Sequence, residues 1–163
     1  MAKILIATEK PFAKVAVDGI KEVAETAGLE IVLLEKYTEK AQLLAAVADV
    51  EAMIIRSDKI DNEVFDAAKN LKIVVRAGAG YDNIDIVYAR KKNVDVMNTP
   101  GANSNAVAEE VMAMILAYYR HIVQADATTR EGLWEKKKYM GSELTKKAVG
   151  IIGLGNIGRN LVK

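Results

Sequence analysis

Two arginines, a serine and a small-residue turn stand where the sequence predicts the ends of two neighbouring apolar strands. The group consists of Arg56, Ser57, Arg76, Gly78 and Ala79. Guanidinium groups, a hydroxyl group and main-chain N–H groups together favour a small anion such as a carboxylate or a phosphate. Ligands of open parallel α/β sheets bind beyond the carboxyl ends of the strands, where these residues fall. The alternative, in which the arginines form surface ion pairs and the glycines only turn the chain, stays open at this point.

A second candidate for binding is a G-x-G-x-x-G motif formed by Gly153, Gly155 and Gly158. The apolar residues 148–152 before it predict a strand, and a helix is expected after it. The first glycine allows a sharp turn, the second a close approach of the backbone to a pyrophosphate, and the third close packing of the helix. This pattern predicts the start of a dinucleotide-binding domain. The acidic residue that binds the ribose is expected about 20 residues later, so we expect the domain to continue beyond Lys163.

The remaining candidates favour structure or assembly over chemistry. His121 is the single histidine, and it lies near a predicted helix end, where a cation interacts well with the helix dipole. We therefore expect it to be structural. The lysines at 136–138 are typical of a solvated run, whereas Trp134 in a polar loop favours a contact with a partner subunit.

Composition excludes several classes of function. The 163 residues carry 23 Lys and Arg against 22 Asp and Glu, a net charge of +1, which argues against a nucleic-acid or membrane surface. The chain has no cysteine, so disulfides and thiolate nucleophiles are excluded. With one histidine, we expect no metal site. No apolar run approaches about 18 residues, and the N-terminus lacks a secretory signal pattern, so we expect a cytoplasmic protein.

Apolar runs alternate with helical patterns over the first hundred residues. Strands are predicted at residues 3–7, 30–34, 52–55, 72–75 and 94–97, and helices at 11–27, 39–48, 61–68 and from about 85. The inward faces of the first two helices are expected to carry Val15, Ile20, Val23 and Ala27, and Leu43, Leu44 and Val47. Successive β-α-β units of this kind predict an α/β fold with a parallel, doubly wound sheet.

The second part of the chain begins after a break at residues 98–105, which is rich in Asn, Gly and Pro. The predicted helix at 105–120 is apolar nearly all round, so it is expected to be buried at a domain or subunit interface. Residues 124–147 are polar and are predicted to be irregular.

These segments together resemble the NAD-dependent D-2-hydroxyacid dehydrogenases. The resemblance rests on Arg56-Ser57 and on residues 75–85, 98–104 and 153–158, and residues 132–135 and 140–144 narrow it to the branch that oxidises 3-phosphoglycerate. It covers essentially the whole chain. It implies a flavodoxin-like substrate-binding domain over residues 1–98 and the beginning of a Rossmann-type NAD-binding domain over residues 99–163.

The resemblance also implies roles for individual residues. The substrate would be held by Arg56, Ser57, Arg76, Gly78 and Ala79, with Asn103 and Ser104 at the border of the cleft and Lys136 reaching toward the substrate of a neighbouring subunit. The pyrophosphate of NAD would be bound by Gly153, Gly155, Asn156, Ile157 and Gly158. A homodimer would form through the helix at 105–120 and the Trp134 loop. Ala79 stands where relatives often carry threonine, so a hydroxyl contact is lost there.

The implied reaction is hydride transfer between C2 of 3-phosphoglycerate and NAD, the first step of serine biosynthesis. The family's catalytic histidine, carboxylate and arginine follow the glycine motif and are absent from these residues, so we expect no catalytic residue and no turnover in this chain alone. Other dehydrogenases of the family remain alternatives, namely hydroxypyruvate or glyoxylate reductases and D-lactate dehydrogenases. A non-catalytic NAD-binding regulator of the same fold is the alternative from a different class.

Overall fold

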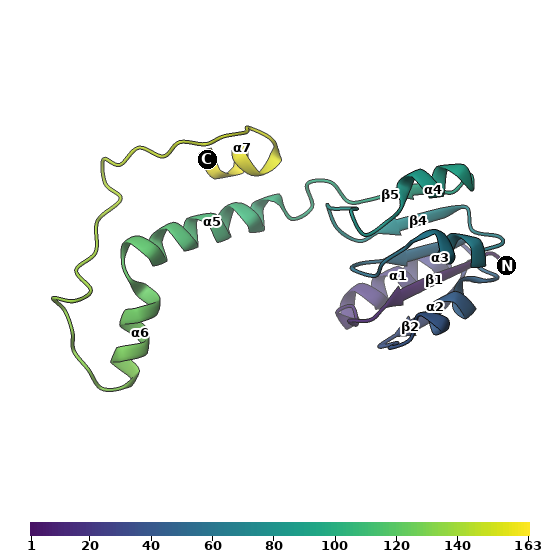
Figure 1. The fold of residues 1–163 in the computed structure, drawn as a ribbon, viewed down its shortest axis with the longest axis horizontal. Coiled ribbons are helices and arrows are strands. Elements are labelled where there is room, and N and C mark those ends of the chain that lie inside the picture. The colour runs from purple at the N-terminus through teal and green to yellow at the C-terminus, as the bar shows by residue number, and fades with distance from the viewer. The chain divides into compact units, whose positions relative to one another are not determined.

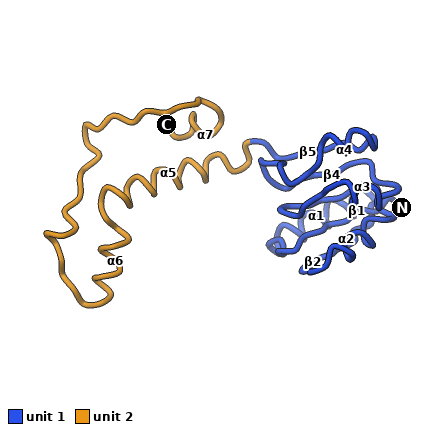
Figure 2. Tube along the Cα trace, in the orientation of Figure 1, with its two compact units in different colours: residues 1–100 blue, residues 101–163 orange.

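The computed structural model describes residues 1–163, which form two compact units, Met1–Pro100 and Gly101–Lys163 (Figure 2). The sequence predicts a domain boundary between residues 98 and 99, close to this division. The functional assignment of the two parts stays a prediction. No helix is both long and apolar enough to cross a membrane.

A five-stranded parallel sheet forms the centre of the first unit, in the order β2-β1-β3-β4-β5 (Figure 1). The strands are β1 (Lys3–Thr8), β2 (Glu30–Glu35), β3 (Ala52–Ile55), β4 (Ile73–Arg76) and β5 (Asp95–Met97). This is the flavodoxin-like strand order, and it confirms the predicted α/β class.

Four helices connect the strands and cover both faces of the sheet. They are α1 (Lys14–Thr26), α2 (Lys40–Val47), α3 (Asn62–Ala67) and α4 (Ile86–Lys91). The last three bury their apolar side chains in one core with the sheet, including Leu43, Val47, Val64, Phe65 and Ala89. The predicted inward positions Leu43 and Val47 are therefore confirmed, and Leu44 packs against the same core.

The predicted inward face of α1 is wrong. Val17 and Ala24 are its buried residues, whereas Val15 and Val23 are 79% and 70% exposed. The helix begins at Lys14 rather than at Pro11, and only one stripe of it contacts the sheet. The position of that stripe depends on how the loop before the helix ends, and side-chain hydrophobicity alone does not reveal it.

The second unit contains three helices, α5 (Ser104–Tyr119), α6 (Ile122–Arg130) and α7 (Asn156–Val162), and α7 packs beside α5 (Figure 1). The helix α6 occupies the start of the segment predicted to be irregular, so that prediction is wrong there. No side chain of α6 is buried, and the apolar periodicity that would have indicated a helix is therefore missing. His121, with φ of 52°, turns the chain between α5 and α6.

Residues 148–152 do not form the predicted strand. A strand needs a neighbour to satisfy its N–H and C=O groups, and the second unit has no other strand. The helix predicted after the glycine motif is present as α7.

Candidate functional site

The carboxyl ends of β3 and β4 bring the two candidate arginines together. Ile55 pairs with Arg76 in the sheet, so the chain leaves β3 at Arg56 directly beside the end of β4. The side chain of Arg76 completes the link, because its Nε donates a 2.9 Å hydrogen bond to the main-chain oxygen of Arg56. Arg56 and Ser57 are exposed and Arg76 is half-buried. Two positive charges and a hydroxyl group therefore share one edge of the sheet.

The turn that follows β4 is held by the end of β5. Thr99 N donates to Gly78 O at 3.0 Å, and Asn98 Nδ2 donates to Ala79 O at 2.7 Å. Both bonds engage carbonyl groups of the turn rather than its N–H groups. The Arg76 guanidinium lies where a Cβ of Gly78 would be, so a glycine is required for this arrangement. Five predicted substrate residues, Arg56, Ser57, Arg76, Gly78 and Ala79, thus lie at one site.

A buried carboxylate that the sequence analysis missed supports this edge. Asp58 is only 2% exposed. Its Oδ1 accepts from Glu9 N at 2.8 Å and from the Tyr37 hydroxyl at 2.7 Å, and its Oδ2 accepts from Arg56 N at 3.4 Å. The run Arg56-Ser57-Asp58 looks like an exposed loop in the sequence, because the donors come from segments far away along the chain.

The tyrosine that binds Asp58 is strongly perturbed. Burial and the hydrogen bond to Asp58 raise the pKa of Tyr37 far above its ordinary value. The hydroxyl therefore remains a donor to the carboxylate over the whole physiological pH range.

Asn83 fixes the loop after β3 from the other side. Its Nδ2 donates to the main-chain oxygens of Asp58 and Arg56 at 2.7 and 3.3 Å. The main-chain oxygen of Arg56 therefore accepts from both Asn83 and Arg76. The loop that carries the candidate arginine is held by contacts from the ends of β1, β2 and β4.

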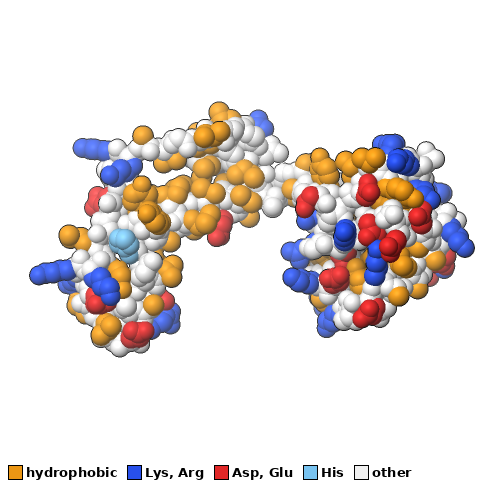
Figure 3. All heavy atoms as spheres, in the orientation of Figure 1, with side chains coloured by type: hydrophobic (Ala, Val, Ile, Leu, Met, Phe, Trp, Pro, Cys, Tyr) orange, Lys and Arg blue, Asp and Glu red, His pale blue; other side chains and the backbone are white.

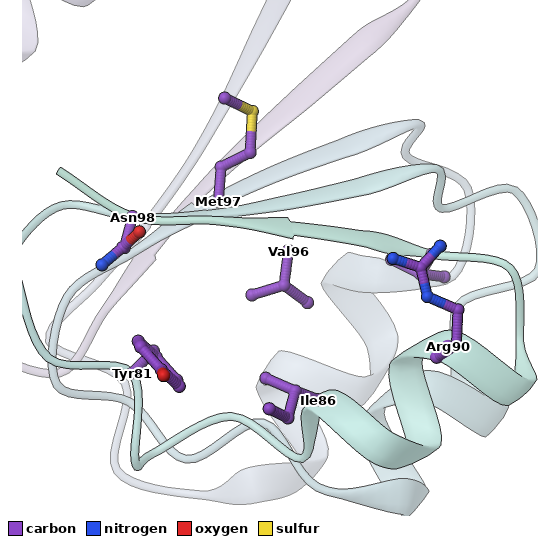
Figure 4. Close-up of a pocket in the computed structure, with 7 residues that line it drawn as sticks. Tyr81, Ile86, Arg90, Val96, Met97 and Asn98 are labelled. Atoms are coloured by element: carbon purple, nitrogen blue, oxygen red, sulfur yellow. The ribbon is translucent and has the colours of Figure 1, made fainter. Parts of the chain in front are cut away.

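A pocket of about 340 Å³ lies between α4 and β5 (Figure 4). Its wall consists of Tyr81, Ile86, Arg90, Val94, Val96, Met97 and Asn98. None of the predicted site residues lines it. It adjoins the site only through Asn98, which also holds the Gly78 turn.

In the second unit, the starts of α5 and α7 meet. A Cβ at Gly101, whose φ is 82°, would lie 3.0 Å from Asn156 Nδ2 and 3.8 Å from Ser104 Oγ. Asn103 precedes α5, and Ser104 is its buried first residue. The structure thus places Asn103 and Ser104, predicted at the substrate cleft, near Asn156, predicted at the cofactor.

The glycine motif has the local geometry that a phosphate-binding turn needs. Gly153 has a φ of 96°, which side chains rarely adopt, and a Cβ at Gly158 would collide with the carbonyl group of Gly153. Gly155 has open space where its Cβ would be. Asn156 and Ile157 form the first turn of α7, with Ile157 42% exposed. The fold thus uses Gly153 and Gly158 for the turn itself and leaves Gly155 open to a ligand.

The remaining two candidates are not part of either group. Lys136 Nζ lies 5.3 Å from the centroid of the exposed Trp134 ring. The His121 ring lies 6.4 Å from that of Tyr139, at the junction of α5 and α6.

Comparisons with known proteins agree with this geometry. The family model described as "D-isomer specific 2-hydroxyacid dehydrogenase, catalytic domain" matches residues 6–157. A D-3-phosphoglycerate dehydrogenase of Archaeoglobus fulgidus is 43% identical over 99% of this chain and 29% of its own length. A hydroxypyruvate reductase of Thermotoga maritima is 43% identical over 82% of this chain and 44% of its own length.

A solved structure shares the fold. The crystal structure of NAD⁺-bound 3-phosphoglycerate dehydrogenase from Entamoeba histolytica matches with a TM-score of 0.81 and 43% identity, over 99% of this chain and 49% of that one. The chain spans less than half the length of each of these three proteins.

Proposed function

Because the chain belongs to the D-isomer specific 2-hydroxyacid dehydrogenases, we propose that it carries the substrate-binding half of an NAD-dependent oxidoreductase. The substrate proposed is a phosphorylated 2-hydroxy acid, 3-phosphoglycerate, whose oxidation at C2 begins serine biosynthesis. Residues 1–98 would bind the substrate, and residues 99–163 would begin the cofactor domain. We place the protein in the cytoplasm.

The observation that carries this proposal is the joining of Arg56 and Arg76 at adjacent strand ends. Two guanidinium groups can bind two anionic groups, and 3-phosphoglycerate has a carboxylate and a phosphate. The Ser57 hydroxyl and the main-chain N–H groups at Gly78 and Ala79 would add neutral donors. An unphosphorylated hydroxy acid would leave one of the charges unused.

The cofactor proposed is NAD. The positive φ of Gly153, the open space at Gly155 and the close approach at Gly158 fit a pyrophosphate beside α7. When bound, NAD would accept the hydride from C2 of the hydroxy acid. Asn156 and Ile157 would present main-chain N–H groups to the phosphates, and Asn103 and Ser104 would border the substrate side of the same cleft. We assign no catalytic base, since His121 sits at a helix junction against Tyr139.

We further propose that the protein is a homodimer through α5 and the Trp134 loop. Apolar side chains gather along α5 (Figure 3), and Met114, Tyr118 and Trp134 are 54%, 78% and 75% exposed. So many exposed apolar side chains in one unit are typical of an interface. Lys136, beside Trp134, would then extend toward the partner's substrate.

The test is a titration of the 163-residue chain with 3-phosphoglycerate, with D-glycerate and hydroxypyruvate as matched ligands that lack the phosphate. We expect main-chain amide NMR shifts at Gly78 and Ala79, and at least about tenfold weaker binding without the phosphate, the loss expected for one charge-assisted contact. Equal binding of all three ligands would instead favour a reductase such as the Thermotoga maritima relative. Turnover by the pure chain would contradict the expectation that it holds no catalytic residue.

A further inference from the structure

We infer that Asp58 is a positioning residue, which fixes the Arg56–Ser57 loop in the conformation that binds the substrate anion. The inference rests on the proposed function in that it names what holds the anion site in place. Asp58 itself does not touch the ligand. Both of its carboxylate oxygens are engaged inside the protein by Glu9 N, the Tyr37 hydroxyl and Arg56 N.

The geometry makes the position of Arg56 depend on Asp58. Arg56 N donates to Oδ2 of Asp58, while Oδ1 is anchored to the loops that follow β1 and β2. The carboxylate therefore ties the start of the candidate arginine's loop to two neighbouring strands. Its burial, at 2% exposure, removes competition from water for these bonds.

Asn83 completes the arrangement. It donates to the main-chain oxygens of Arg56 and Asp58, so the loop is gripped through its N–H group at one point and its C=O groups at two others. Arg76 donates to the same Arg56 oxygen. A shift of Asp58 would therefore move both guanidinium groups of the proposed site.

The chain supplies a matched control for this pair. Asp66 accepts a 2.8 Å hydrogen bond from the Tyr88 hydroxyl, which repeats the chemistry of Asp58 and Tyr37. The Asp66 pair is exposed and joins α3 to α4 away from the arginines. Equivalent substitutions in the two pairs thus remove the same bond, at the site and away from it.

The experiment compares Asp58→Asn and Tyr37→Phe with Asp66→Asn and Tyr88→Phe in the 163-residue chain. Asparagine at 58 keeps Oδ1 as an acceptor but turns an N–H group toward Arg56 N. We expect the dissociation constant for 3-phosphoglycerate to rise about tenfold in Asp58→Asn and about fivefold in Tyr37→Phe, the range expected for one lost hydrogen bond. Both controls should bind as the wild type does.

Hydrogen exchange separates positioning from general stability. The amides of Arg56 and Glu9 should exchange faster in the two site variants, while those of Met53 and Val74 in the core keep their protection. The double variant should lose less affinity than the sum of the two changes, because both act through one carboxylate. If Asp58→Asn loses core protection, the milder Tyr37→Phe decides.

Unchanged affinity together with unchanged exchange at Arg56 would overturn the inference. Wild-type chain that fails to bind 3-phosphoglycerate would overturn the proposed function instead. In that case the exchange rates at Arg56 still show whether Asp58 positions the loop.

Discussion

The guanidinium group of Arg76 occupies the space in which a Cβ atom of Gly78 would lie. The side chain that is proposed to bind the anion thus folds over the backbone of the turn that is proposed to donate N–H groups to it. From this position its Nε reaches the carbonyl group of Arg56. One glycine therefore controls the placement of both arginines.

Alanine at position 78 should displace Arg76 and break its bond to Arg56. We expect Gly78→Ala to weaken binding of 3-phosphoglycerate about tenfold, the cost of one charge-assisted hydrogen bond, measured by calorimetric titration. The control is Gly19→Ala in α1, where nothing lies within 4 Å of the added Cβ. That variant should bind normally and gain about 0.5–1 kcal/mol in free energy of unfolding, since alanine favours a helix over glycine. Normal affinity in Gly78→Ala would contradict the role of Arg76.

The second and third glycines of the motif should respond differently to alanine. In Gly158→Ala the new methyl group collides with the carbonyl group of Gly153, so α7 should lose its docking and its amides should exchange faster. Gly155→Ala meets no neighbour, so exchange should be unchanged while binding of NAD weakens. Hydrogen exchange at Arg159, whose N–H donates to Gly155 O at 3.0 Å, measures the first effect. Equal exchange in both variants would show that Gly158 is not a packing position.

The raised pKa of Tyr37 predicts a loss of stability in alkali. The folded protein holds this hydroxyl protonated, whereas the unfolded chain releases the proton near pH 10. The contribution is therefore complete below about pH 10 and is lost as the pH rises above it. Urea unfolding at pH 9 and pH 11 should show a smaller loss in Tyr37→Phe than in the wild type. Tyr88→Phe provides a comparison at the exposed pair, and identical pH dependence in Tyr37→Phe and the wild type would sink the prediction.

The proposed dimer depends on apolar side chains that are exposed in the single chain. We expect Tyr118→Ser combined with Trp134→Ser to lower the mass at 50–100 µM in sedimentation equilibrium from that of two chains to that of one, a working range on the order of typical dimer affinities. Val15→Ser removes a similarly exposed apolar group from α1 and should leave the mass unchanged. A wild-type chain that remains a monomer at these concentrations would refute the interface.

The sequence predicts the first unit well because its signals are local. Residues 52–55 form β3 with the predicted bounds, since a short apolar run between polar segments has few other structures available. The arginine pair could also be predicted, because parallel strands end at the same edge of a sheet. Asp58 could not, since its burial depends on Glu9 and Tyr37, which are distant in the sequence.

The second unit shows where local signals fail. The helix α6 has no buried face and therefore no apolar period to reveal it. Residues 148–152 have the composition of a strand, but pairing requires a second strand, and this unit provides none. The positions of Gly153 and Gly158 were predictable because their turn is made within a few residues.

The two edges of the sheet carry acidic residues. β2 begins and ends with Glu30 and Glu35, and β5 has only three residues and begins with Asp95. Edge strands offer unpaired N–H and C=O groups to any other extended chain, and charge or shortness at an edge opposes such pairing. These carboxylates thus protect the sheet against growth into intermolecular β-structure. Apolar residues at the same three positions would convert each edge into a template for aggregation.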